Sequence, residues 1–144
     1  QHGWLRKIVF NMAGCERLSG DIKVFEHTKG LTEINMGDTG VRGDIKVFEH
    51  TKQLKDLSMD ACCKITGDIK VFEHTKGLKE VNMRGCDQIT GDIGDLANCH
   101  GLTKANFYYC IQLTGKEISW DFHFEPVTSK FPESFRDPYV RSRA

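Results

Sequence analysis

The chain has 144 residues, which is enough for one domain or one array of small repeats. It carries 20 basic residues (Lys and Arg) and 20 acidic residues (Asp and Glu), so no long-range field favours nucleic acid or an anionic membrane. A hydrophobic share of 39% lies above the range of disordered chains, and we expect a folded protein.

Targeting signals are not evident along the chain. No apolar run approaches the roughly 20 residues that a membrane-spanning helix needs, and the first residues lack the features of a secretion signal. We therefore expect no membrane insertion. The compartment is unknown; the cysteines sit in a repeat and no glycosylation sequon is present, which favours a reducing, intracellular compartment over a lumenal one.

The chain begins with a bare first segment. Trp4 and Leu5 lead almost directly into an apolar stretch that ends like the later repeats. No cap is visible before it, although every repeat array must protect its open ends. We expect either more chain before Gln1 or a partner at this end, which favours a subunit of a larger assembly.

The next part of the chain repeats itself. The decapeptide Gly-Asp-Ile-Lys-Val-Phe-Glu-His-Thr-Lys begins at Gly20, Gly43 and Gly67, and shorter versions begin at Gly91 and Gly115. The period is therefore 23 residues once and 24 residues three times. A fixed period of this size indicates a solenoid of stacked units.

A second shared half lies between the decapeptides and reads L-x-x-L-x-L-x-x-C/T, followed by an apolar residue. Its last two apolar residues are two positions apart, as a strand requires to place both on one face. Pairs such as Ile34 and Met36 should therefore point inward. An imperfect earlier copy with Phe10 and Met12 brings the number of predicted strand segments to about five.

This pattern resembles the leucine-rich-repeat family over nearly all of residues 5–118. The segment Ile-Thr-Gly-Asp-Ile is similar to the plant-type subclass, and Cys-x-x-Ile-Thr is similar to the cysteine-containing subclass. The resemblance implies an α/β solenoid with a parallel β-sheet on its concave face and short helical or irregular turns on its convex face. We expect about five repeats within residues 1–118.

The decapeptide half is predicted to form the other wall of the core. Ile69, Phe72 and Leu78 have the spacing for this role, with Asp68 capping a short helical turn and Gly77 ending it. A single repeat buries only about five apolar side chains, at about 1.5 to 3 kcal/mol each, which does not outweigh the entropy of ordering it. Stacking of repeats is therefore obligatory.

Cysteine and histidine each recur at one position of the repeat, so that each would form a stacked row, or ladder, along the solenoid. Such rows suggest a metal-binding hypothesis. Cysteines at positions 15, 62, 86 and 110, with Thr39 replacing them once, occupy the position where the family keeps a small residue that bonds the neighbouring turn. His27, His50 and His74 recur in the decapeptide between Lys and Glu residues. We favour a structural ladder and a solvated exterior over zinc binding, since no Cys-x-x-Cys pair exists. No metal and no cofactor are expected.

The repeat ends near residue 118, and the composition then changes. All three prolines and several aromatic residues follow: Trp120, Phe122, Phe124, Pro126, Phe131, Pro132, Phe135, Pro138 and Tyr139. We predict a non-repeat C-terminal cap and extended tail over residues 119–144. The alternating Trp-Asp-Phe-His-Phe segment suits a cap over the open end of the solenoid.

The candidate binding residues are the outward positions of the strand half. These positions vary between copies, whereas the decapeptide is unchanged, and their side chains are expected to project from the strands onto the concave face. They are Glu33, Asn35, Asp38, Asp56, Ser58, Asp60, Glu80, Asn82, Arg84, Lys104, Asn106, Tyr108 and Tyr109. Glu33, Asp56 and Glu80 make an acidic stripe suited to a basic partner segment, and the two tyrosines supply aromatic contact area. A plain solvated sheet face is the alternative.

The sequence favours a protein-binding module or scaffold that recognises a partner mainly through its concave face. It contains no phosphate loop, nucleophile elbow or metalloprotease helix, so we expect no catalytic residues and no enzyme. No nucleic-acid reader motif is present. One alternative is a structural accessory subunit of a large complex, docked by its ends and aromatic tail. Another is a metal or redox sensor that uses the histidine ladder or Cys63.

Overall fold

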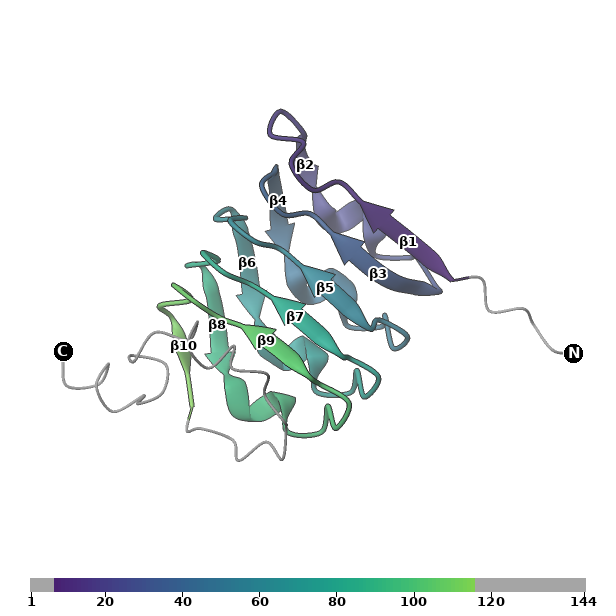
Figure 1. Ribbon diagram of the computed structural model, residues 1–144, viewed down its shortest axis with the longest axis vertical. Helices are drawn as coiled ribbons and strands as arrows, with labels where there is room; N and C mark the ends of the chain where they lie inside the picture. Colours follow the sequence, from purple (N-terminus) through teal and green to yellow (C-terminus); the bar gives the residue numbers. More distant parts are fainter. Residues whose placement is uncertain (1–6, 116–144) are drawn as a thin grey trace, which may run out of the picture.

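The computed structural model describes residues 7–115, which form a solenoid of short strands and 3₁₀ helices (Figure 1). Each repeat makes one coil and stacks on the next, as the period predicted. None of the helices in this part of the chain is long and apolar enough to cross a membrane. The cap and tail predicted for residues 119–144 lie outside the described residues.

One parallel sheet is built from the L-x-x-L-x-L segments. Its strands, in spatial order, are β1 (Ile8–Asn11), β3 (Leu31–Asn35), β5 (Asp56–Ser58), β7 (Glu80–Asn82) and β9 (Lys104–Asn106). Each strand pairs with the copy one repeat away, so that Ile34 is aligned with Leu57 and Leu57 with Val81. The side chains of these three residues are 2% exposed, which confirms that they point inward.

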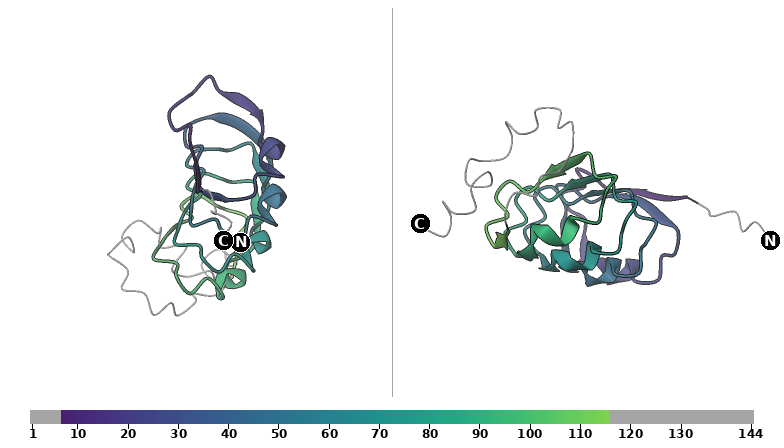
Figure 2. Two further views of the ribbon diagram at one scale, coloured as in Figure 1. Left: turned by 90° about the vertical axis from the view of Figure 1, so that its right-hand side faces the viewer. Right: turned by 90° about the horizontal axis from the view of Figure 1, so that it is seen from below.

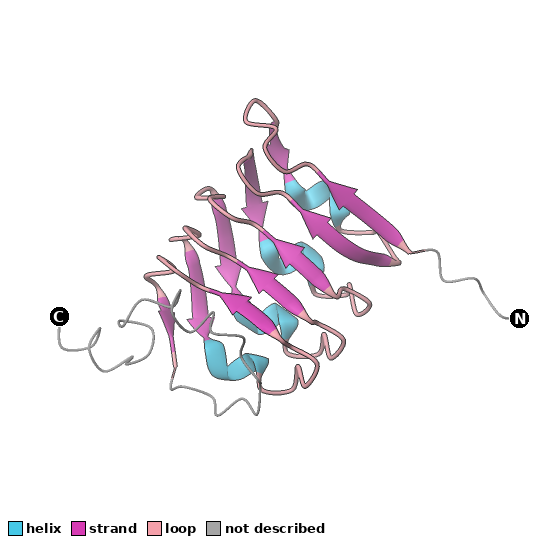
Figure 3. Cartoon of the chain, viewed as in Figure 1, coloured by secondary structure: helices cyan, strands magenta, loops and turns pink. Residues whose placement is uncertain are grey.

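A second parallel sheet faces the first across the core, and the sequence did not predict it. Its strands, in spatial order, are β2 (Ser19–Asp21), β4 (Gly40–Asp44), β6 (Ile65–Asp68), β8 (Ile89–Asp92) and β10 (Leu113–Thr114). Figure 3 shows β2, β4, β6 and β8 leading directly into the helices. Each has only two to five residues, which is too short for a visible alternation of apolar and polar side chains.

The helical turns of the decapeptides stack along one side of the molecule, opposite the first sheet (Figure 2). They are the 3₁₀ helices η1 (Ile22–Phe25), η2 (Ile45–Phe48), η3 (Ile69–Phe72) and η4 (Ile93–Leu96). Asp68 caps η3 as predicted, because its Oδ1 accepts a hydrogen bond of 2.8 Å from the backbone N–H of Lys70. The prediction for Gly77 was wrong: η3 ends at Phe72, with Glu73 as its C-cap.

The core lies between the two sheets and the helices. Ile69, Phe72 and Leu78 are fully buried, as predicted, and the rings of Phe48 and Phe72 stack with centroids 6.4 Å apart. Thr75 is buried at 1% exposure, and Cys99 takes the same place in the next repeat. Each coil thus contributes the same few side chains to one continuous core.

In the second sheet, neighbouring repeats approach each other most closely at the glycine that opens each decapeptide. Gly67 on β6 has φ of +120°, a conformation that residues with side chains rarely adopt. The carboxylate of Asp44, which caps η2, lies against Gly67, so a Cβ there would overlap its Oδ1 atom. The Gly-Asp pair that opens each decapeptide therefore serves both the helix of its own repeat and the fit of the next repeat.

Candidate functional site

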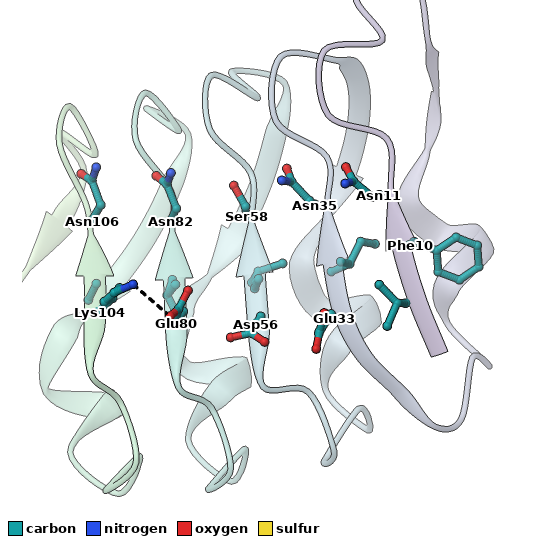
Figure 4. Close-up of a pocket in the computed structure, with 15 residues that line it drawn as sticks. Phe10, Asn11, Glu33, Asn35, Asp56, Ser58, Glu80, Asn82, Lys104 and Asn106 are labelled. Atoms are coloured by element: carbon teal, nitrogen blue, oxygen red, sulfur yellow. Dashed lines mark ion pairs between the residues drawn. The ribbon is translucent and has the colours of Figure 1, made fainter. Parts of the chain in front are cut away.

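The outward face of the first sheet forms an open groove of about 800 Å³ (Figure 4). All five strands of the sheet contribute to it. Of the residues nominated from the sequence, those that line the groove are Glu33, Asn35, Asp56, Ser58, Glu80, Asn82, Lys104 and Asn106. The strand alternation placed these side chains correctly on the outer face.

The groove side chains stand in two rows that cross the strands. Glu33, Asp56 and Glu80 are aligned with one another on β3, β5 and β7 and are called the carboxylate row below; Lys104 follows them on β9. The amide row consists of Asn11, Asn35, Ser58, Asn82 and Asn106. Neighbouring members of a row are about 4.8 Å apart, and the two rows are separated by about 6.6 Å.

The two end members of the carboxylate row are paired with lysines, whereas the middle one is not. Lys7 lies 2.5 Å from Glu33 at one end, and Lys104 lies 3.3 Å from Glu80 at the other. Asp56, between them, makes no ion pair within residues 7–115. Partial burial raises the pKa of Asp56, and the charges of Glu80 and Glu33 raise it further. The centre of the groove therefore holds a carboxylate without a cation.

The asparagines of the amide row stabilise the turns with one side-chain atom and present the other to the groove. The Oδ1 atoms of Asn35, Asn82 and Asn106 accept hydrogen bonds of 3.0 to 3.1 Å from the backbone N–H two residues ahead, which fixes the turn after each strand. Because only oxygen can accept from an N–H, the Nδ2 groups are left as donors. Within the described part of the chain they make no hydrogen bond.

The remaining nominated residues lie beside the groove rather than in it. Asp38, Asp60, Arg84, Tyr108 and Tyr109 occupy the turns that follow the strands. The prediction that they project from the strands was wrong, because each of these strands ends one residue before the buried Met or Phe, and the chain then turns. Asp38 and Tyr109 take a left-handed backbone conformation, with φ of 55° and 61°.

These turn residues form a polar and aromatic rim at one edge of the groove. Arg84 donates a hydrogen bond of 2.8 Å from Nε to Oδ1 of Asp60 in the preceding repeat. The rings of Tyr108 and Tyr109 meet edge to face, with centroids 4.2 Å apart, and Tyr109 is 59% exposed. The rim thus offers aromatic surface next to an internally paired arginine.

Strand β1 also lines the groove, through Val9, Phe10 and Asn11. These residues were not among the binding residues predicted from the sequence. Asn11 is aligned with Asn35. The imperfect first repeat already has an asparagine at this position in the sequence, so Asn11 could have been predicted as a member of the row. Phe10 was expected to point inward like its aligned residue Ile34, but it is 37% exposed, because no described strand lies beyond β1 to cover it. Its ring packs edge to face on Phe25, with centroids 5.1 Å apart.

The histidine ladder lies on the helical side, away from the groove. The side chains of His27, His50 and His74 are 75% to 91% exposed, and each lies 3.9 to 4.0 Å from the glutamate before it. In residues 7–115 no group of three or more His, Cys, Asp or Glu side chains is arranged to hold a metal ion.

Solved structures with a similar fold were found. The LRR ectodomain of the plant membrane receptor kinase GASSHO1/SCHENGEN3 from Arabidopsis thaliana, in complex with CASPARIAN STRIP INTEGRITY FACTOR 2, matches 83% of this chain with a TM-score of 0.60 at 15% identity. An internalin from Listeria monocytogenes matches 72% of the chain with a TM-score of 0.47 at 18% identity. The chain spans 16% and 28% of the length of these two proteins. No family model and no curated protein matches the sequence.

Proposed function

We propose that this chain, which has the leucine-rich-repeat fold, is a binding module that recognises a protein partner through the groove of its first sheet. The Arabidopsis thaliana ectodomain with the same fold is solved in complex with CASPARIAN STRIP INTEGRITY FACTOR 2, which supports a binding role for a chain of this fold. A shared fold does not determine which partner is bound. Recognition by this chain must therefore come from the side chains on its own surface.

One observation carries the proposal: an open groove of about 800 Å³ crosses five strands and presents charged and amide side chains in two regular rows. The side chains beneath it are buried in the core, so the core does not depend on the residues of the carboxylate row, whose side chains lie on the outer face. Aromatic surface at Tyr108 and Tyr109 adjoins it, and such residues contribute strongly to interfaces.

The first test is to block the groove without disturbing the core. Ser58 is half-buried at the centre of the groove, so Ser58→Trp should fill it and abolish partner binding. Lys46→Trp, on the exposed surface of η2, is the matched control and should retain binding. The measurement is quantitative mass spectrometry of proteins captured by each folded variant from an extract of the source cells.

We expect a partner that wild type and Lys46→Trp capture equally and that Ser58→Trp loses by at least about tenfold. Equal capture by all three folded variants would contradict a groove-based function. A partner that stays bound to Ser58→Trp but is lost when residues 126–144 are deleted would instead indicate the accessory subunit docked by its tail.

A further inference from the structure

The central strand of the groove differs from its neighbours in the size of its side chains. The carboxylate row has Glu33 on β3 and Glu80 on β7 but the shorter Asp56 on β5. The amide row has asparagine on β3 and β7 but the smaller Ser58 on β5. Both rows thus have their shorter side chain on β5 (Figure 4). The space that these smaller side chains leave between Asp56 and Ser58 is called the recess below.

The electrostatics of this recess favour a cation. Asp56 has a glutamate on each side, about 4.8 Å away in the ladder. The two lysines paired with those glutamates stand at opposite ends of the row, and their side chains are 61% and 59% exposed. Lys79 and Lys7 act on the pKa of Asp56 less strongly than either glutamate does. The field at the recess is therefore negative.

The amide row favours a bound peptide whose main chain is extended and lies beside the recess. The asparagines on β3, β7 and β9 keep their Nδ2 groups free within the described residues, while their Oδ1 atoms are held by the turns; β5 carries Ser58 at this position instead. A peptide that lies across the strands presents carbonyl oxygens to such donors. The five strands span about 19 Å, which about six extended residues cover.

We infer that the segment recognised by this groove is an extended peptide of about six residues that places one arginine or lysine side chain in the recess between Asp56 and Ser58. This inference rests on the proposed function and names the chemistry of its partner. The basic group pairs with the Asp56 carboxylate, and the Ser58 hydroxyl accepts one of its remaining N–H donors. The peptide backbone accepts hydrogen bonds from the amide row.

A random 12-residue peptide library displayed on phage, selected against the full chain, tests the inference without knowledge of the natural partner. We expect the selected peptides to share one basic residue at an aligned position. Fluorescence anisotropy with the best peptide should show binding that is about tenfold weaker to Asp56→Asn, because one charge pair is lost. Replacement of the basic residue in the peptide by glutamine should weaken binding to the same extent.

Two further variants separate the recess from general charge. Ser58→Asn keeps the charge of Asp56 but fills the recess, and it should also weaken binding about tenfold. Glu49→Gln removes the same charge from the exposed surface next to η2 and should change the affinity less than about twofold. Asp56→Asn should fold normally, since it replaces a carboxylate whose charged form is disfavoured by burial and by two neighbouring carboxylates.

The outcomes separate the inference from the proposed function. Peptides that depend on the groove, as shown by their loss with Ser58→Trp, but that carry no shared basic residue would overturn the inference and leave the function standing. A library that gives no groove-dependent peptide would overturn the inference, and the capture experiment with Ser58→Trp would then decide the proposed function. A dimer in light scattering that Ser58→Trp dissociates would show that a second copy occupies the groove, and would also overturn the inference.

Discussion

At the scale of single residues, buried cysteines close the turns after β5, β7 and β9. The Sγ atoms of Cys62, Cys86 and Cys110 donate hydrogen bonds of 2.9 to 3.1 Å to the methionine carbonyl of the preceding repeat. Thr39 donates at 2.7 Å to the Met36 carbonyl within its own repeat. A hydroxyl and a thiol serve the same column because both are small donors next to a buried carbonyl. The column thus joins neighbouring repeats through the core.

Burial makes these thiols unreactive, because the thiolate is the nucleophile. It raises the pKa of Cys62 and Cys86, and that of Cys99 to about 11. We predict that two of the six cysteines, the exposed Cys15 and Cys63, react rapidly with Ellman's reagent at pH 8.

The four buried cysteines should react only as fast as the protein unfolds, and all six should react at once in denaturant. The release of thionitrobenzoate, followed with time, measures both phases. More than two rapidly reacting thiols in the folded protein would show that the column is open to solvent.

At the scale of elements, the junction between a capped helix and the next strand couples one repeat to another. Asp44 caps η2 and lies against Gly67 of β6, and the same arrangement recurs at Asp68 and Gly91. The carboxylate can approach this closely only because glycine has no Cβ. The Gly-Asp pair, which four of the five repeat starts share, therefore makes a contact between coils in addition to forming a turn.

We predict that Gly67→Ala lowers the free energy of unfolding by about 2 to 4 kcal/mol, because it adds backbone strain and an overlap with Asp44. Gly77→Ala is the control: it has no positive φ and no atom within 4 Å of its added Cβ, so stability should change by less than about 1 kcal/mol. Urea denaturation followed by circular dichroism gives both values. Similar losses for the two variants would refute the proposed contact.

The sequence predicts elements where side chains alternate, and it fails where backbone geometry decides. Ile34 and Met36, two apart and both buried, identified the first sheet and the outward Glu33 and Asn35. The strands of the second sheet are held by pairing to copies of themselves, which leaves little trace in residue type. Tyr109 was misplaced because its left-handed turn depends on backbone φ and not on hydrophobic period. The charge balance at Asp56 emerged only from the aligned strands.

At the scale of the whole molecule, the chain is a one-dimensional stack. Strand β1 pairs only with β3, and β9 only with β7, whereas β3, β5 and β7 have a described neighbour on each side. Stability in such a stack is a sum of repeat and interface terms. The described strands at the two ends of the first sheet therefore have half of the strand pairing that supports the middle.

We predict that backbone amides of β5 and β7 exchange with deuterium at least about tenfold more slowly than those of β1. Hydrogen exchange with mass spectrometry, on peptides that cover each repeat, measures this directly. Equal protection of all strands would mean that the solenoid opens as a single unit, contrary to the expectation from nearest-neighbour coupling.

The three identical decapeptides also bear on how such a chain changes in evolution. Because they carry the same helix cap, the same core side chains and an Asp that meets the glycine of the next repeat, one unit fits the repeat after it as well as another. Unequal recombination between them inserts or removes a whole coil without creating a foreign junction. Each such event lengthens or shortens the groove by one strand, about 4.8 Å. The uniform helical side thus lets the length of the groove change in whole-repeat steps.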